Sequence, residues 1–196
     1  MHSYREFILP MNSITATSTS GATLWMYGTS QLTSSAGTLD ISSTASSSGT
    51  YGIYQDASSI ISSYGNANIT TTGVQNGIYM ETSSILRSTN GTMTIDASAA
   101  SGYYGIETYN SSQITSYGAM SITTSSVSTW ALVMRASSKI ESTNGTLALT
   151  ATPTTTSGGG IFMASGTQIL SSSDMSIYAK QATAFGNAGL WMDAGS

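Results

Sequence analysis

The sequence predicts an all-β protein, a parallel β-solenoid of about seven coils with three short strands in each coil of 25–29 residues. Apolar residues recur at fixed spacing, with eight residues between the first two of each unit and six or seven between the second and third. Charged residues make up 7% of the chain, against roughly 25% in an ordinary globular protein. Because the apolar residues keep a constant phase, they can form a continuous core.

The clearest copy of the unit is Gly77–Asp96, in which Ile78, Leu86 and Met93 start the three predicted strands. A variable segment rich in Ser, Thr, Gly and Ala then leads to the next copy. The corresponding first and second positions of the other copies are Leu24/Leu32, Ile53/Ile61, Ile106/Ile114, Leu132/Ile140 and Ile161/Ile169. Three strands, two tight corners and one elastic loop describe one coil of a solenoid.

Side chains alternate faces along a strand, which assigns each predicted position to the interior or the surface. In the first strands, of the form Leu24-Trp25-Met26, the first and third residues are expected inside. The second strands have the form Ile/Leu-x-Ser, which predicts an inner column of serines that bond to the bending backbone. Glycines such as Gly91 and Gly145 follow at the second corner, where a positive φ is expected.

The repeat also predicts the domain organisation. Residues 1–10 do not match it and are expected to form an N-terminal extension or cap. Residues 11–196 are expected to form a single solenoid domain. Successive coils alternate in length, which indicates two-coil blocks of about 54 residues.

Composition argues against several classes of function. A net charge of −4 does not favour nucleic acid as a partner. No run of about 20 apolar residues is present, so no membrane span is predicted. Asp56 and Glu81 fall at corresponding places in adjacent coils, the one suggestive carboxylate pair. The single histidine, His2, lies outside the repeat. The sequence therefore predicts no catalytic residue, no cofactor and no metal ligand.

One column of outward residues stands apart from the polar surface. The middle residue of each first strand is apolar or aromatic in six coils, and Glu107 takes the place in the other. A column this apolar on an outer face indicates that something covers it, such as the elastic loop, a neighbouring rod, or a sugar stacked on the rings. The candidate interaction face is Trp25, Tyr54, Tyr79, Val133, Phe162 and Trp191.

Outward threonine pairs such as Thr92/Thr94 are typical of ice-binding solenoids. The pair is not repeated, since the same places hold residues such as Asp40, Ala148 and Asp174 in other coils. The sequence pattern therefore disfavours ice binding.

The alternation of Gly-Ile, Ile-x-Ser and Asn-Gly-Thr-Leu/Met-x-Ile, as in Gly77–Asp96, resembles the haemagglutinin-type repeats of filamentous bacterial exoproteins. Two-partner-secreted adhesins and autotransporter passengers carry such repeats. The resemblance implies a right-handed β-helix, a secreted or cell-surface location, and a non-catalytic structural or adhesive role. Glycan-binding or glycan-cleaving β-helices, similar to tailspikes or polysaccharide lyases, are the alternative.

The predicted strands at the two ends of the chain lack partners. The chain stops after the first-strand piece Leu190–Met192 and enters near a third strand. Unpaired strand edges invite another chain to add on. One hypothesis is therefore a subunit that associates with itself, head to tail, into a filament; the other is a segment of a longer adhesin.

Overall fold

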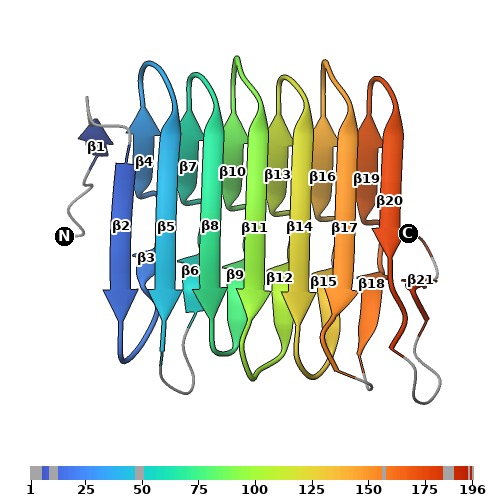
Figure 1. The fold of residues 1–196 in the computed structure, drawn as a ribbon. Helices are drawn as coiled ribbons and strands as arrows, with labels where there is room; N and C mark the ends of the chain where they lie inside the picture. The colour runs from blue at the N-terminus through green and yellow to red at the C-terminus, as the bar shows by residue number, and fades with distance from the viewer. Residues whose placement is uncertain are drawn as a thin grey trace.

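The structure is a computed structural model that describes residues 6–8, 13–46, 51–155, 158–182, 188–193 and 195. It confirms a parallel β-solenoid built from three seven-stranded sheets (Figure 1). Six complete coils each contribute one strand to every sheet, and partial coils lie at both ends. The described residues contain strands and connecting turns, with no helix among them.

Sheet A contains the predicted second strands. Its members, in spatial order, are β1 (Glu6–Ile8), β4 (Gln31–Ser34), β7 (Ile60–Ser63), β10 (Ile85–Ser88), β13 (Gln113–Ser116), β16 (Lys139–Ser142) and β19 (Gln168–Ser171). The first of them falls in the predicted N-terminal extension, where Phe7 pairs with Leu32 as one more row of the ladder.

Sheet B contains the predicted third strands, which are longer than expected. They are β2 (Ser13–Ser18), β5 (Leu39–Ala45), β8 (Ala67–Gly73), β11 (Met93–Ala99), β14 (Met120–Ser126), β17 (Leu147–Pro153) and β20 (Met175–Ala179). Much of the Ser- and Thr-rich sequence expected to be loop is therefore strand.

Sheet C contains the predicted first strands, most of them extended by two residues at their start. They are β3 (Leu24–Met26), β6 (Tyr51–Gln55), β9 (Asn76–Met80), β12 (Tyr104–Thr108), β15 (Trp130–Met134), β18 (Gly159–Met163) and β21 (Leu190–Met192).

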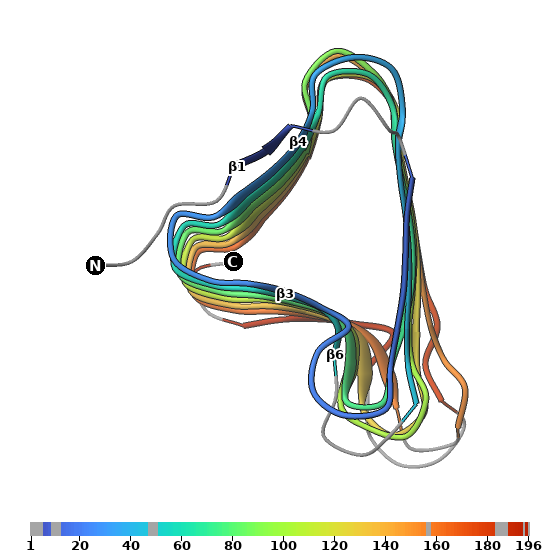
Figure 2. The same ribbon diagram turned by 90° about the vertical axis from the view of Figure 1, so that its left-hand side faces the viewer.

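The coil is right-handed. Seen from the N-terminal end, the chain runs from sheet C through sheet A to sheet B in a clockwise sense as it recedes (Figure 2). The cross-section is three-sided, with a narrow extension where the second half of each sheet B strand faces the start of a sheet C strand.

The predicted interior positions form the core. Ile78 and Leu86 have no exposed surface, and Met93 is 1% exposed. Equivalent residues of neighbouring coils stack directly on them, since the strands pair in register, for example Ile78 with Ile106 and Leu86 with Ile114. Six of the predicted interior methionines are buried, whereas Met175 and Met192, in the last coils, are exposed.

The inner serine column bonds to the second corner, as predicted. Ser88 Oγ donates to the carbonyl oxygen of Gly65 at 2.6 Å, and Ser142 Oγ donates to that of Gly118 at 2.9 Å. Each serine thus ties its own coil to the corner of the preceding coil. This arrangement gives a buried serine hydroxyl a hydrogen-bond partner with a small side chain.

The reason expected for the glycines of that corner was wrong at Gly65, Gly91, Gly118 and Gly145, because positive φ is found there only at Gly37. These glycines are needed because coils approach closely. A Cβ at Gly65 would lie 2.2 Å from the carbonyl oxygen of Gly37, and one at Gly145 would lie 2.5 Å from the nitrogen of Ala119.

Positive φ occurs instead at the first corner, between sheets C and A. Two consecutive residues are left-handed there in four coils, for example Ala136 at 51° and Ser137 at 62°. The nitrogen of Ser137 then donates to the carbonyl oxygen of Ser165 in the following coil at 2.8 Å. An inter-coil hydrogen bond at each step offsets the cost of this backbone shape.

Sheets B and C meet closely at the narrow extension of the cross-section, where the side chains are small. Thr71 Oγ1 donates to the carbonyl oxygen of Gly77 at 2.9 Å, and Thr124 Oγ1 donates to that of Ala131 at 2.9 Å. A Cβ at Gly77 would lie 2.7 Å from the carbonyl oxygen of Gly105. The Gly-Ile pairs of the repeat therefore mark the places where two sheets pack backbone to backbone.

Candidate functional site

The outer face of sheet C carries the predicted interaction face. Strand pairing places Trp25, Tyr54, Tyr79, Glu107, Val133, Phe162 and Trp191 in one column, a single residue per coil. Exposure is uneven along this column. Trp25 is 63% exposed and Trp191 is 49% exposed, whereas Tyr54, Tyr79 and Phe162 are half-buried.

Val133 corrects the prediction, because it has no exposed surface and offers nothing to a partner. It lies in register between Glu107 and Phe162. The Arg135 guanidinium stands 5.7 Å from the Tyr104 ring centre and 5.8 Å from that of Phe162, in the coils on either side of Val133. Val133 lies in the middle of sheet C, between the larger side chains of Glu107 and Phe162 in the same column. An outward position in a strand can thus be shielded from solvent by side chains of the neighbouring coils.

A second column, which the sequence analysis missed, lies beside the first. Its members directly precede the Gly-Ile pairs, or Ala131-Leu132 in one coil, and are Tyr51, Asn76, Tyr104, Trp130 and Gly159. Gly159 leaves room for a ring, since a Cβ there would lie 2.3 Å from Trp130. Aromatic residues directly before the Gly-Ile pairs were the available signal.

Four aromatic rings of the two columns form a cluster at the N-terminal half of sheet C. Tyr54 and Tyr79 are stacked, with ring centres 5.3 Å apart and planes inclined at 30°. Tyr51 packs edge-on against Tyr54 at 5.3 Å, and Trp25 lies 5.2 Å from Tyr54. Because Tyr54 and Tyr79 are stacked, the ring faces between them are not free to stack on a sugar ring, whereas Trp25 is 63% exposed.

Glu81 closes the cluster on its polar side. The hydroxyl of Tyr54 donates to Glu81 Oε1 at 2.8 Å, and that of Tyr79 donates to Oε2 at 3.0 Å. Burial raises the pKa of both tyrosines, and the hydrogen bonds to Glu81 raise these pKa values further. Both oxygens of this carboxylate are thus held by hydroxyl donors from two adjacent coils.

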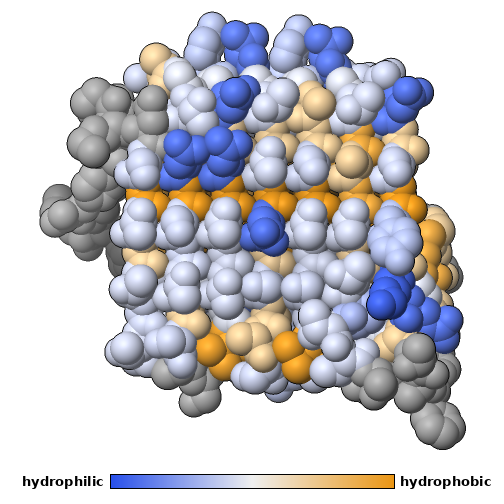
Figure 3. Space-filling view, in the orientation of Figure 1, coloured by the Kyte–Doolittle hydropathy of each residue, from blue (hydrophilic) through white to orange (hydrophobic). Residues whose placement is uncertain are grey.

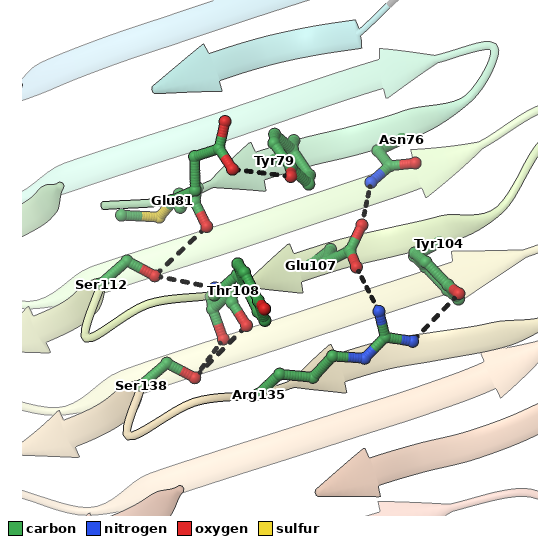
Figure 4. A network of polar contacts seen from close by, with 11 residues as sticks. Asn76, Tyr79, Glu81, Tyr104, Glu107, Thr108, Ser112, Arg135 and Ser138 are labelled. Carbon is green, nitrogen blue, oxygen red and sulfur yellow. Dashed lines mark hydrogen bonds and ion pairs between the residues drawn. The ribbon is translucent and has the colours of Figure 1, made fainter. Parts of the chain in front are cut away.

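Glu107 lies at the centre of a second polar network (Figure 4). Asn76 Nδ2 donates to Glu107 Oε2 at 3.0 Å, and Arg135 Nη1 donates to Oε1 at 3.2 Å. Arg135 Nη2 donates to the hydroxyl of Tyr104 at 3.3 Å. Burial raises the pKa of Glu107, while Asn76 and Arg135 act to lower this pKa. The network links three consecutive coils on their outer face.

The suggestive carboxylate pair does not form a joint site. Asp56 Oδ1 accepts a hydrogen bond from the backbone nitrogen of Ala57, while Glu81 is bound by the two tyrosines. Within the described part of the chain, no group of three or more His, Cys, Asp or Glu side chains could hold a metal ion. These described residues also include no helix suited by length and apolarity to crossing a bilayer. The polar groups of this face bind one another across coils.

Comparisons with protein-family models, with curated proteins and with solved structures found no match to this chain.

Proposed function

We propose that this chain is a non-catalytic structural rod of a secreted or cell-surface protein, and that it extends by coil-on-coil stacking with a second copy. The observation that carries the proposal is the apolar edge of the last coils. Met175, Ile177, Leu190 and Met192 are 38–56% exposed. The matching residues of the preceding coil are almost fully buried, for example Leu147 at 1% and Ile161 at 0%.

These exposed side chains surround a hollow of about 280 Å³ at the C-terminal edge. A smaller one, of about 180 Å³, lies at the N-terminal edge and is lined by residues that include Ile14, Leu24 and Leu32. Each edge also presents one strand from each of the three sheets, namely β19, β20 and β21 at one edge and β1, β2 and β3 at the other. A second copy in the same orientation matches both the apolar surface and the direction of the strands.

The polar contacts of sheet C support a structural role. The side chains of Glu81 and Glu107 bind partners in neighbouring coils and so reinforce the ladder of backbone hydrogen bonds. The resemblance of the repeats to those of filamentous exoproteins supports the location. The glycan alternative has less support because the stacked Tyr54 and Tyr79 rings occupy each other's faces.

The test is the assembly state of the intact chain over a range of concentrations, by sedimentation and by negative-stain electron microscopy. We expect rods that lengthen by whole subunits as concentration rises. Met175→Lys puts a charge into the stacking edge and should leave single subunits. Thr115→Lys, on the outer face of sheet A, is the matched control and should assemble as the unmodified chain does. An intact chain that stays single at every concentration would overturn the proposal.

A further inference from the structure

The outer face of sheet B carries a regular array of small polar side chains. Its outward side chains include two adjacent columns, which we call the hydroxyl face. One column is Thr15, Ser42, Thr70, Asp96, Thr123 and Thr150, and the other is Thr17, Thr44, Thr72, Ser98, Ser125 and Thr152. The pair Thr92/Thr94 considered from the sequence is not repeated, whereas these two columns repeat further along the sheet B strands.

The hydroxyl face is open and flat. Strands β2 to β17 run side by side with no segment crossing in front of them (Figure 1). Small side chains of similar hydropathy stand in straight rows over the sheet (Figure 3). Rows follow the strand spacing of about 4.8 Å, and the two columns are two residues, or about 6.6 Å, apart. The face is therefore a two-dimensional lattice of hydroxyl and methyl groups.

The outward hydroxyls have no structural task in most rows. Those of Thr15, Ser42, Thr70, Thr123 and Thr150 have no hydrogen-bond partner within the described residues. Inward hydroxyls of the same strands differ, since Ser43 donates to the carbonyl oxygen of Gly52 at 2.6 Å and Thr71 to that of Gly77. The outer hydroxyls are left to bind something outside the chain.

The chemistry of the hydroxyl face narrows the class of partner. Asp96 is its one charged residue, and it holds no Lys or Arg, so an anionic membrane or nucleic acid does not fit. Its columns from β2 to β17 hold no aromatic residue, and the first column meets a single ring at the C-terminal edge, Tyr178, which pairs with Thr150 and is 57% exposed. Protein interfaces are rich in Tyr, Trp, Met and Arg and poor in Ser, the reverse of this face. A nearly uncharged lattice fits an uncharged, flat and periodic partner.

We propose that the hydroxyl face binds the surface of ice. Hydroxyls both donate and accept hydrogen bonds, as the water molecules of a crystal surface do. Threonine is stiff at χ1, and the sheet holds every row at a fixed spacing, so little conformational entropy is lost on binding. Once one row of hydroxyls is bound, the rigid sheet holds the next row close to the ice surface. Many individually weak contacts therefore add up to a stable attachment. This inference goes beyond the rod function and does not depend on end-to-end stacking.

The test is thermal hysteresis of the intact chain, together with its uptake into a slowly growing ice hemisphere. We expect measurable hysteresis and uptake for the unmodified chain. Thr123→Tyr places a large ring at the centre of the hydroxyl face and should reduce hysteresis several-fold. Thr115→Tyr makes the same change in the same coil on sheet A and should leave hysteresis unchanged. Circular dichroism melting of both variants checks that the solenoid is folded. If Thr123→Tyr is unfolded, Thr70→Tyr, in the same column of the hydroxyl face, replaces it.

Three results would overturn the proposal. The first is an unmodified chain that gives no hysteresis and is excluded from ice. The second is equal hysteresis in the folded Thr123→Tyr and Thr115→Tyr variants, or equal loss in both, because the hydroxyl face would then not be the binding surface. The third is exclusion from ice together with retention on an insoluble crystalline glucan, which would assign the lattice to a polysaccharide.

Discussion

Arg135 Nη1 lies 3.2 Å from Glu107 Oε1 in the preceding coil, in an ion pair whose side chains are 39% and 11% exposed, respectively. The pair is formed across the parallel ladder of sheet C, between residues that are 28 positions apart in the chain. Arg135 also contacts Tyr104, a neighbour that the sequence pattern did not predict. Burial and these neighbours act in opposite directions on the pKa of Glu107, which burial raises and Arg135 and Asn76 lower.

Glu107 should make stability depend on pH. Burial raises the pKa of Glu107 in the folded chain above its ordinary value. The contribution of this group to stability is therefore full below the ordinary carboxyl pKa, and it is lost as pH rises through the raised folded pKa. We therefore expect the unmodified chain to lose stability relative to Glu107→Gln as pH rises above the ordinary carboxyl pKa of about 4.3. Urea unfolding of both chains at several pH values measures this difference in unfolding free energy. Glu141→Gln controls for the loss of one formal charge, and a pH-independent difference would contradict the prediction.

The stacked core should be sensitive to truncation at its centre. Leu86 has no exposed surface and lies in register between Ile61 and Ile114. Leu86→Ala should lower the free energy of unfolding by about 2–5 kcal/mol because it leaves a cavity in the stack. Thr94→Ala, at an exposed position beside Met93, should change it by less than about 0.5 kcal/mol. Chemical denaturation compares the two, and equal costs would show that the inside and outside assignments are wrong.

The contact between sheets B and C should not accept a side chain at Gly77. Its Cβ would lie 2.7 Å from the carbonyl oxygen of Gly105 and 2.8 Å from the nitrogen of Ser98, and neither backbone atom can move aside alone. Gly77→Ala should therefore destabilise the chain by about 1–3 kcal/mol. The reciprocal change Ala131→Gly, at the matching position two coils on, should cost about 0.5–1 kcal/mol. Thermal unfolding of both variants measures these losses of stability. A Gly77→Ala variant more stable than the unmodified chain would show that sheets B and C are further apart at this position.

The left-handed first corner should accept glycine. Ala136 has φ of 51°, a shape that costs an L-residue about 1–2 kcal/mol. Glycine at this position removes this conformational cost. It also makes the unfolded chain more flexible, which lowers the free energy of unfolding by about 0.4–1 kcal/mol. Ala136→Gly should therefore raise the free energy of unfolding by up to about 1 kcal/mol. Ala148→Gly, on an exposed position of β17, should lower it instead, and a loss of stability in both variants would argue against the left-handed corner.

The sequence by itself determined the repeat, the three strands of each coil and the inside or outside direction of most residues. Ile78, Leu86 and Met93 show why, since a period of two along a strand and a constant spacing between strands leave few ways to close a shared core. The inner serines were predicted for the same reason. These properties depend on residues that are near one another in the chain.

Only the tertiary structure decided how much of each outward side chain stays exposed. Val133 is buried and Trp25 is exposed at equivalent positions, because Val133 has a paired strand on both sides whereas Trp25 lies on the edge strand of sheet C. The glycines of the second corner are explained by a neighbouring coil rather than by their own φ. Serine- and threonine-rich segments became strands because adjacent coils supply hydrogen-bond partners that local propensity does not show. In a solenoid these neighbours lie one coil away, and stacking alone brings them into contact.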